Sequence, residues 1–426
     1  MTDKFQPLKG TRDFLPKEKI AREKIIKVLA DTFEEFGFNP IETPCIEKWE
    51  IATLKGSSDE TTDVYRETYR FKDQGERDLV LRYELTFPLA RLMAANPQIP
   101  KPFKRYHIGK VWRDGPVKKG RYREFWQCDV DTIGSDSLVA DAEMLAMYTR
   151  VFERLGLDIV IKVNNRKFLD GLLASAGIPE EFRKGMMISL DKLEKIGEAG
   201  VIEDAKERGI EENMVRKVFD LVGDMDQIFD ERVRKGKQDI EKLMEYAQNL
   251  GAKNMEFCPT LTRGLTYYTG PIFEVFLKNE EFKSSLAGGG RWDKMISQFT
   301  ESVVDVPATG TSFGLDTIYD ALVLKGRIKE EKSVVDVFVI PIKTTEYCMK
   351  VLEELRDLGV RADMDLMGRS LSKNLSHANS LGIPYCIIVG QKELMKKSVN
   401  LRDMKTGKES LISFEDLKKE IKNVKK

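Results

Sequence analysis

The clearest pattern of polar and apolar positions lies in residues 103–134, where they alternate with a period of two around a short segment rich in Gly, Pro and Lys. Period-two alternation is typical of strands, and two such runs predict a β-hairpin with long arms. In the second arm, one face carries Tyr122, Trp126, Cys128 and Val130. The opposite face carries Arg121, Arg123, Phe125, Gln127, Asp129 and Asp131. That mixture suits a ligand with phosphate, a flat ring and a charged amino group, although an exposed hairpin face of chance composition would look the same.

The remaining patterns before residue 330 predict a mixture of helices and strands. Residues 17–36 and 137–155 each have apolar side chains at helical spacing, whereas residues 65–86 are typical of successive strands joined by a turn. From about 168 to 250 the chain becomes a series of charged, lysine-rich helices. This stretch predicts an inserted helical subdomain or, alternatively, a set of peripheral helices.

After residue 326 the chain changes to an alternation of apolar strands and amphipathic helices. A charged linker, GRIKEEK, precedes the largely apolar strand VVDVFVIPI, and a hairpin and a lysine-rich helix are expected at the end. Such alternation predicts a small parallel or mixed sheet covered by helices. We therefore expect an α+β chain with two domains, residues 1–326 with the insertion at about 168–250, and residues 333–426.

Composition adds information mainly where it is local. The 426 residues hold 70 Lys and Arg against 70 Asp and Glu, so net charge gives no argument for a nucleic-acid partner. Residues 101–123 are nevertheless strongly basic, and a focused basic patch can hold polyanions. The 5 cysteines form no CxxC pair, and 2 histidines supply few zinc ligands. We expect a cytoplasmic protein without membrane contact, because no apolar run approaches the ~20 residues of a membrane span and no signal peptide is evident.

A second segment, LTRGLTYYTGPIFEVF at residues 261–276, gives the chain a family resemblance. Two further motifs, AGGGRWD and GTSFGLD, follow it. Three others precede it in the chain, namely KGTRDFLP near the N-terminus, LVLRYELTFPLAR at residues 79–91 and KGRYREF in the hairpin. Together these motifs resemble the histidyl-tRNA synthetases, a family of class II aminoacyl-tRNA synthetases. The C-terminal region resembles the anticodon-binding domain of several class II enzymes, so the resemblance covers essentially the whole chain.

The resemblance implies both a fold and a reaction. The fold is a class II catalytic domain, an antiparallel sheet flanked by helices, with a helical insertion and a C-terminal α/β anticodon-binding domain. The reaction is histidine–tRNA ligation, in which ATP converts L-histidine to histidyl-adenylate with release of pyrophosphate, and histidine passes to the 3′-terminal adenosine of tRNA(His). Mg2+ is expected with ATP, although the sequence identifies no ligands for it. The segment around Pro40 and Pro44 resembles motif 1 and implies a homodimer, although prolines are equally typical of an edge strand.

Arginines suit this reaction because attack of a carboxylate on the α-phosphorus brings two anions together, and guanidinium groups are always charged and bind in forked pairs. The resemblance assigns Arg113 to the substrate carboxylate and the α-phosphate, and Arg263 to the α-phosphate from the other side. These two are the expected catalytic residues. Arg121 is expected at the outer phosphates, and Phe125 is expected to stack on adenine.

For histidine, the resemblance assigns Glu84, Thr86 and Gln127 to the ammonium group. Asp131 matches an acceptor for an imidazole nitrogen, and Tyr268 matches a hydroxyl that bonds the ring. Polar contacts to the ring reject apolar isosteres by roughly 10⁴-fold or more. The full expected histidine-binding set is Glu84, Thr86, Arg113, Gln127, Asp131, Arg263, Tyr267 and Tyr268. Tyr267 has core packing as an ordinary alternative, and Thr86 has helix capping.

The chain departs from the family pattern at several points of the site. Motif 2 reads RDG from Arg113, where Arg-x-Glu is usual, and motif 3 is followed by Thr317, where an arginine is usual. Thr266 stands in place of an aspartate, and Trp292 in place of a tyrosine. The resemblance also implies a tight turn at residues 288–290 that lets the backbone approach histidine.

Two other functions fit parts of the sequence. A non-catalytic, synthetase-like regulatory subunit of histidine biosynthesis would explain the absent motif 3 arginine. Such relatives typically lack the C-terminal domain and parts of the Arg263 peptide, and both are present here. A synthetase for glycine, proline or threonine would share the C-terminal domain type, but the Arg263 peptide and the set of Glu84, Gln127 and Asp131 oppose it.

Overall fold

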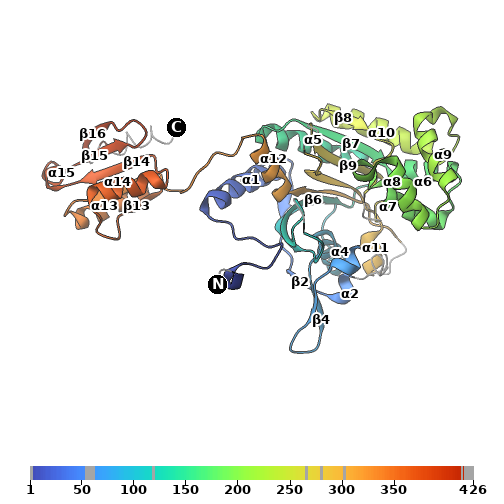
Figure 1. Ribbon diagram of the computed structural model, residues 1–426, viewed down its shortest axis with the longest axis horizontal. Coiled ribbons are helices and arrows are strands. Elements are labelled where there is room, and N and C mark those ends of the chain that lie inside the picture. The colour runs from blue at the N-terminus through green and yellow to red at the C-terminus, as the bar shows by residue number, and fades with distance from the viewer. Residues whose placement is uncertain are drawn as a thin grey trace. The chain divides into compact units, whose positions relative to one another are not determined.

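The computed structural model describes residues 3–52, 63–117, 120–263, 267–278, 282–300, 304–413 and 416. The chain divides into two compact units, one of residues 1–13 and 25–327 and the other of residues 14–24 and 328–426. Figure 1 labels many of the helices and strands of both units. The expected C-terminal lysine-rich helix, and the positions Gly264 and Thr266, lie outside the described residues.

The first unit is built on an eight-stranded sheet with the order β1-β5-β6-β11-β10-β9-β7-β8. Its strands are β1 (Asn39–Pro40), β5 (Phe103–Trp112), β6 (Glu124–Ile133), β7 (Ile159–Asn165), β8 (Met255–Phe257), β9 (Pro271–Leu277), β10 (Ala287–Arg291) and β11 (Ala308–Gly314). From β5 to β7 all neighbours are antiparallel, whereas the edge pairs β1–β5 and β7–β8 are parallel. The expected antiparallel sheet and its long hairpin are therefore confirmed, with parallel pairs only at the edges.

Helix α5 (Leu138–Leu155) supports the sheet on the face away from the site described below. It begins after Ser137, whose hydroxyl accepts a hydrogen bond from the Val139 amide at 3.2 Å. Its Tyr148 ring packs against the rings of Phe313 and Phe273, at centroid distances of 5.3 and 5.9 Å. Two aromatic contacts of this kind fix strands β9 and β11 beneath the helix.

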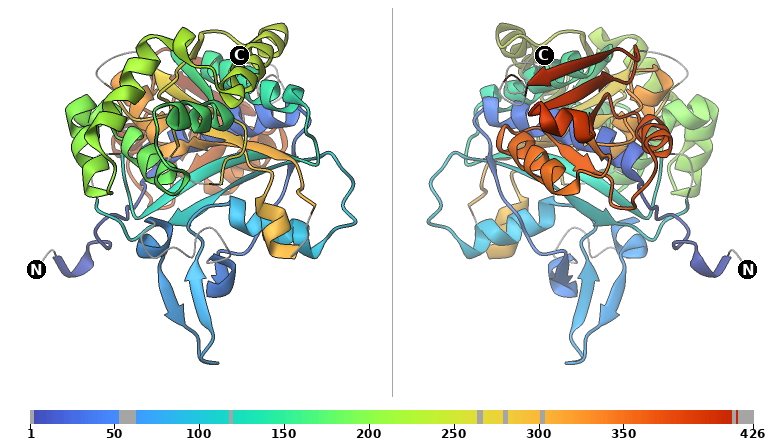
Figure 2. Two further views of the ribbon diagram at one scale, coloured as in Figure 1. Left: turned by 90° about the vertical axis from the view of Figure 1, so that its right-hand side faces the viewer. Right: turned by 90° about the vertical axis from the view of Figure 1, so that its left-hand side faces the viewer.

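The segment before the hairpin forms a smaller three-stranded sheet with the order β2-β4-β3. Its strands are β2 (Ile46–Lys48), β3 (Arg70–Lys72) and β4 (Asp78–Leu81), and the helices α2 (Trp49–Ala52) and α3 (Asp63–Glu67) precede β3. Figure 2 shows the β3–β4 hairpin extending away from the rest of its unit. The prediction of strands throughout residues 65–86 is therefore wrong at its start, because residues 63–67 form a short helix, and at its end, where α4 (Thr86–Ala95) begins.

The stretch from about 168 to 250 is helical, as its sequence predicts. The helices are α6 (Arg166–Ser175), α7 (Glu180–Leu190), α8 (Leu193–Glu207), α9 (Glu212–Gly223) and α10 (Glu231–Asn249). Helices α10 and α6 approach closely at Gly236, where an added Cβ would lie 2.6 Å from the Phe168 backbone nitrogen. Phe168 belongs to a buried cluster that also contains Tyr268 and Trp292, so the apolar faces of these helices share a core with the sheet.

The second unit contains a five-stranded sheet with the order β13-β12-β14-β15-β16. Its elements are β12 (Val337–Pro341), α13 (Thr345–Asp357), β13 (Ala362–Met364), α14 (Leu371–Ser380), β14 (Tyr385–Val389), α15 (Gln391–Met395), β15 (Ser398–Asp403) and β16 (Glu409–Ser413). Strand β12 is parallel to β13 and β14, and the last two pairs are antiparallel. The predicted mixed sheet is confirmed. In the described part of the chain, we find no helix with the length and apolarity that a membrane crossing requires.

Candidate active site

A cavity of about 1420 Å³ lies in the first unit, over the strands β6, β9, β10 and β11. Its walls also include residues of α4, α7 and α8 and the segment before β9. The cavity brings together every site residue expected from the sequence, namely Glu84, Thr86, Arg113, Arg121, Phe125, Gln127, Asp131, Arg263, Tyr267 and Tyr268. The described residues that line it come from segments far apart in the chain, so the tertiary fold assembles one site.

Strand β6 supplies the floor of the cavity through its period-two alternation. Gln127, Asp129 and Asp131 line the cavity, whereas Cys128 and Val130 on the opposite face are fully buried. In the register with β11, Ser312 lies opposite Asp129 and Gly310 lies opposite Asp131. Gly310 is required there because an added Cβ would collide with the Asp131 carboxylate.

Three arginines of the cavity are held by different partners. The Arg113 Nε donates to the Tyr83 carbonyl at 3.3 Å, and its guanidinium lies 5.0 Å from the centre of the Phe125 ring. Arg121 forms an ion pair with Glu67. These contacts orient two fixed positive charges that border a common space with an aromatic ring.

The third arginine, Arg263, is anchored by strand β9. Its Nη1 lies 3.0 Å from Glu274 Oε1. Burial would lower the pKa of Arg263, but the neighbouring Tyr268 and Glu274 raise it above its ordinary value. The guanidinium therefore stays charged although its side chain is only 20% exposed.

The glycines at residues 288–290 allow neighbouring groups to pack closely against the chain and do not form a turn. They lie within strand β10, so the expectation of a tight turn is wrong. A Cβ at Gly288 would collide with the Arg263 guanidinium, and one at Gly289 would collide with the Gly310 carbonyl. The reason for the glycines is close packing, because only residues without side chains let Arg263 and β11 approach this strand.

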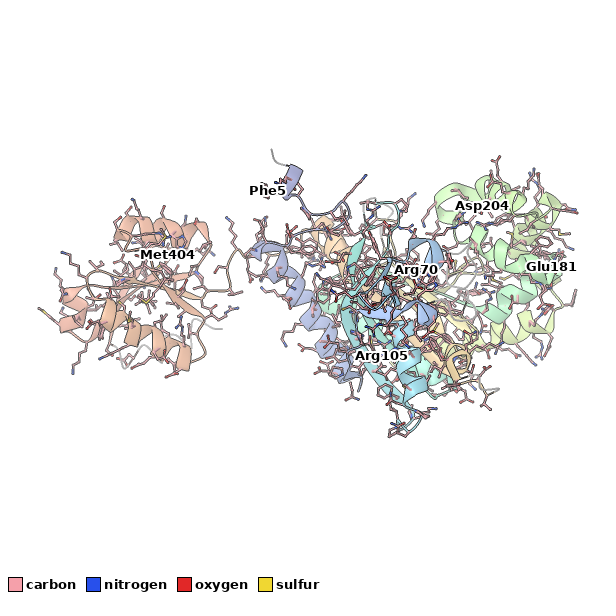
Figure 3. The ribbon with its side chains drawn as sticks, turned by 90° about the horizontal axis from the view of Figure 1, so that it is seen from below. Phe5, Arg70, Arg105, Glu181, Asp204 and Met404 are labelled. Atoms are coloured by element: carbon pink, nitrogen blue, oxygen red, sulfur yellow. The ribbon has the colours of Figure 1, made fainter. Side chains whose placement is uncertain are left out.

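Asp131 is already engaged by two partners. Its Oδ2 pairs with Arg105, which is fully buried, and its Oδ1 accepts a hydrogen bond from the Trp292 indole at 3.1 Å. Figure 3 labels Arg105 within the first unit. Burial raises the pKa of Asp131, whereas the charge of Arg105 lowers it. Trp292 thus has a direct role beside the site, since its N–H donates to the carboxylate expected to face imidazole.

Two other carboxylates of the cavity lack such a pairing. The pKa of Glu84 is raised to about 8, mainly by burial; the Arg113 charge opposes this shift, and the charges of Asp129 and Asp131 add to it. Burial also raises the pKa of Asp129 to about 7. Buried acids with raised pKa values that line one cavity are typical of functional sites.

Tyr267 and Tyr268 combine packing with a place in the cavity wall. Their rings lie 4.8 Å apart, and Tyr267 also meets Phe87 edge-on at 6.4 Å. A hydrogen bond from Tyr267 lowers the pKa of Glu84, so its hydroxyl faces that carboxylate. Thr86 is buried at the start of α4, which has Leu85 as its N-cap and no side-chain cap, so the helix-cap alternative for Thr86 is wrong.

The departure in motif 2 has a counterpart elsewhere in the chain. Asp114 turns away from the cavity and pairs with Arg123 at 3.1 Å. The space beside Gly115 is filled by the Glu67 carboxylate, because a Cβ added to Gly115 would lie 2.6 Å from Glu67 Oε1. Gly115 therefore permits a carboxylate from α3 to reach Arg121.

In motif 3, Thr317 lines the cavity, and its hydroxyl donates to the Gly314 carbonyl at 2.9 Å. The adjacent Asp316 accepts from Arg12 at 2.5 Å and from the Trp126 amide at 3.2 Å. The guanidinium of Arg12 stacks over the Tyr122 ring at 3.6 Å. The N-terminal KGTRDFLP segment thus connects the end of motif 3 to the hairpin.

Several residues of the site were not predicted from the sequence. Asp129 lies on the predicted cavity face of β6, so its signal was present in the alternation, but no role was assigned to it. Glu67 and Glu274 gave no comparable signal, because their importance depends on contacts with Arg121 and Arg263. Within the described residues, no group of three or more His, Cys, Asp and Glu side chains is arranged to hold a metal ion.

Comparisons with known proteins cover nearly the whole chain. The family model described as histidyl-tRNA synthetase matches residues 10–318, and the model described as anticodon binding domain matches residues 336–424. A curated relative from Bacillus cereus, named histidine–tRNA ligase 1, is 43% identical over 422 residues and covers 96% of this chain and 98% of its own length.

Solved structures show the same likeness. The histidyl-tRNA synthetase of Nostoc sp. PCC 7120 has a TM-score of 0.84 and 30% identity, with 98% of this chain and 99% of that chain covered. A Bacillus halodurans C protein described as an ATP phosphoribosyltransferase regulatory subunit/histidyl-tRNA synthetase has a TM-score of 0.73, covering 91% of this chain and 99% of that chain. Its 22% identity shows a shared fold alone. The matched family model and the relatives together show that the chain belongs to the histidyl-tRNA synthetase family.

Proposed function

We propose that this protein activates L-histidine with ATP, releases pyrophosphate, and transfers histidine to the 3′-terminal adenosine of tRNA(His). The observation that carries the proposal is the common cavity, in which Arg113, Arg121 and Arg263 accompany the buried acids Glu84 and Asp131. Arginines suit the anionic triphosphate and carboxylate, and acids suit the ammonium and imidazole groups. Family membership supports the same reaction.

In the activation step, an oxygen of the histidine carboxylate attacks the α-phosphorus, and the bond to the pyrophosphate oxygen breaks. Arg113 and Arg263 are proposed to contact the α-phosphate from two sides. Both are held by protein partners before ATP arrives, Arg113 by the Tyr83 carbonyl and Arg263 by Glu274. Fixed donors of this kind stabilise developing charge without reorganisation in the transition state.

Arg121 is proposed to bind the outer phosphates, and Phe125 to stack on adenine. The position of the Arg113 guanidinium over the Phe125 ring supports an adenine site next to the α-phosphate site. ATP brings Mg2+, which offsets charge on the phosphates when bound. Mg2+ usually keeps waters and takes only one or two carboxylates beside phosphates, so it needs no dedicated cluster of cavity acids.

For histidine, Glu84, Thr86 and Gln127 are proposed to bind the ammonium group. Asp131 and Tyr268 are proposed to recognise the imidazole ring, with Trp292 and Arg105 fixing the orientation of Asp131. Tyr267 is proposed to contribute through its contact with Glu84. A site with several oriented polar groups discriminates strongly against amino acids that leave them without partners.

We propose further that residues 1–326 form the catalytic domain and residues 333–426 the anticodon-binding domain. A homodimer through motif 1 is proposed because β1 lies at the edge of the sheet, where Pro40 is tolerated. Size-exclusion chromatography with light scattering tests this assembly. The proposed site of action is the cytoplasm, where ATP and tRNA are available.

The regulatory-subunit alternative is not favoured. The relatives named as histidine–tRNA ligases match this chain over nearly its whole length, including the C-terminal region. The one feature that supports it is Thr317 in place of the motif 3 arginine. Pyrophosphate exchange decides between the two functions, because a regulatory subunit catalyses none.

The proposed function is tested by histidine-dependent ATP–pyrophosphate exchange, with the other amino acids as controls and Arg263→Ala alongside. We expect exchange with histidine only, lost in the variant, followed by charging of tRNA(His). Absence of exchange with every amino acid, from folded protein supplied with Mg2+, would overturn the proposal and make the regulatory alternative the better one.

A further inference from the structure

Three acceptor-only oxygen atoms of the cavity are buried and have no hydrogen-bond partner among the described residues; the Thr262 hydroxyl is also without a partner, but it can itself donate. The three acceptors are Glu84 Oε1, Gln127 Oε1 and Asp129 Oδ1. A buried acceptor without a donor loses its hydrogen bonds to water and gains none in return, so native proteins rarely leave one unexplained. Three such atoms in the wall of one cavity indicate a ligand that donates hydrogen bonds.

Two other carboxylates of the cavity already have partners. Both oxygens of Asp131 have partners, Arg105 and Trp292, and Glu274 pairs with Arg263. The opposite group of Gln127, its Nε2, donates to Ser312 Oγ at 3.1 Å. The remaining acceptors therefore belong to two carboxylates and one amide.

Strand geometry and electrostatics bring these acceptors to one place. Gln127 and Asp129 are separated by two residues of β6, about 7 Å, and both project from the cavity face. Ser312 on β11 lies opposite Asp129 and bonds to Gln127, so it connects the two. The charge of Asp129 raises the pKa of Glu84, which requires the two carboxylates to be close.

The number and charge of the acceptors select the donor. A primary ammonium group has three N–H donors and no acceptor, which matches three acceptor oxygens. Its positive charge also compensates two carboxylates that burial otherwise disfavours in their ionised form. A neutral hydroxyl or water supplies fewer donors and no charge.

We propose that Asp129 is a substrate-binding residue that, together with Glu84 and Gln127, accepts the hydrogen bonds of the α-ammonium group of the amino acid, with Thr86 bordering the same subsite. The inference rests on the proposed function and extends it, because the family resemblance assigned no role to Asp129. Histidine then binds between an ammonium subsite formed by these oxygens and a ring subsite at Asp131.

The test compares Asp129→Asn with a matched control, Asp136→Asn, whose side chain is exposed after the end of β6. The asparagine keeps the shape of the side chain and removes its charge. Binding is measured by calorimetry for L-histidine, for L-histidinol, which retains the ammonium and the ring, and for 3-(imidazol-4-yl)propionate, which lacks the ammonium. KM for ATP and for histidine is measured by pyrophosphate exchange.

We expect Asp129→Asn to weaken histidine and histidinol by about 30-fold or more, since it removes a buried charged partner of a cation. Binding of imidazolylpropionate and the KM for ATP stay within about twofold of the wild-type values, which also shows that the site is folded. The control variant matches the wild type for every ligand.

Unchanged histidine binding in Asp129→Asn would overturn the inference. Equal weakening of imidazolylpropionate would also overturn it, because the residue would then serve the ring or the fold. A wild-type protein that binds no histidine would overturn the proposed function, and the inference with it. If the wild-type protein binds histidine and Asp129→Asn binds it equally well, only the inference about Asp129 is overturned.

Discussion

The Glu67 carboxylate lies against Gly115 and pairs with Arg121, so a side chain at position 115 is expected to displace it from that arginine. In Gly115→Ala, the new Cβ would lie 2.6 Å from Glu67 Oε1 and 2.7 Å from its Cδ. Because carbon atoms pack best at about 3.5–4.0 Å, the carboxylate has to withdraw by about 1 Å, which breaks its contact with Arg121. A hydrogen bond to a charged group contributes about 1.5–3 kcal/mol.

Solvent reduces that contribution, because the Arg121 side chain is 36% exposed. We therefore expect about 1–2 kcal/mol, or a 5- to 30-fold loss in kcat/KM for ATP. Glu67→Ala is expected to cause a similar loss, since it removes the same ion pair. In the double variant the collision no longer exists, so Gly115→Ala adds nothing to the effect of Glu67→Ala.

The assay is ATP–pyrophosphate exchange at saturating histidine with ATP varied. Gly223→Ala is the matched control, because a Cβ at Gly223 meets no atom within 4 Å. Losses that add in the double variant would refute the reasoning, since independent sites behave in that way. Wild-type kinetics in Gly115→Ala would refute it as well.

Three further predictions concern the same cavity. Arg263→Ala is expected to lower kcat for pyrophosphate exchange by about 10²- to 10³-fold. Arg263→Lys is expected to restore little of this activity, because lysine lacks the forked donors of arginine. Near-normal exchange in either variant would contradict the prediction. The pKa values of Glu84 and Asp129 are raised to about 8 and about 7 in the folded protein. Above the ordinary carboxyl pKa of ~4, the folded protein therefore binds more protons than the unfolded chain. Its free energy of unfolding should then fall as the pH rises toward 8. Bound histidine should stabilise the ionised form of the two acids, so adding histidine should raise Tm more at pH 8 than at pH 6. Equal Tm shifts at the two pH values, measured by thermal unfolding, would contradict this prediction. Arg105→Met leaves Asp131 as a buried charge without its partner and should destabilise the protein by about 3–5 kcal/mol; an unchanged Tm would exclude this.

Much of the fold was determined by local patterns in the sequence. The period-two alternation of residues 103–134 was sufficient to predict the long hairpin and that Gln127, Asp129 and Asp131 share one face, which lines the cavity. The division into faces held only in part, because Tyr122 and Trp126 of the other predicted face also line the cavity and Arg123 does not. Helical spacing likewise predicted α5 and the helices from 168 to 250. These predictions succeeded because the period of a strand or helix is a property of a few consecutive residues. The short helix at residues 63–67 was missed because a segment of that length carries too few periods to identify.

The chemistry of the site was only partly local. The family motifs gave the residue types, and the fold placed all of those expected residues in one cavity. The motifs did not reveal that Glu67 occupies the space beside Gly115, or that the glycines at 288–290 make room for Arg263.

The tertiary structure alone decided which polar groups are already satisfied. Trp292 reaches Asp131 across 161 positions of the chain, and Arg121 reaches Glu67 across 54. Contacts between residues so far apart leave no periodic pattern in the sequence, so they cannot be inferred from it. They depend on how strands and helices pack, and that packing determines which carboxylates remain available for a substrate.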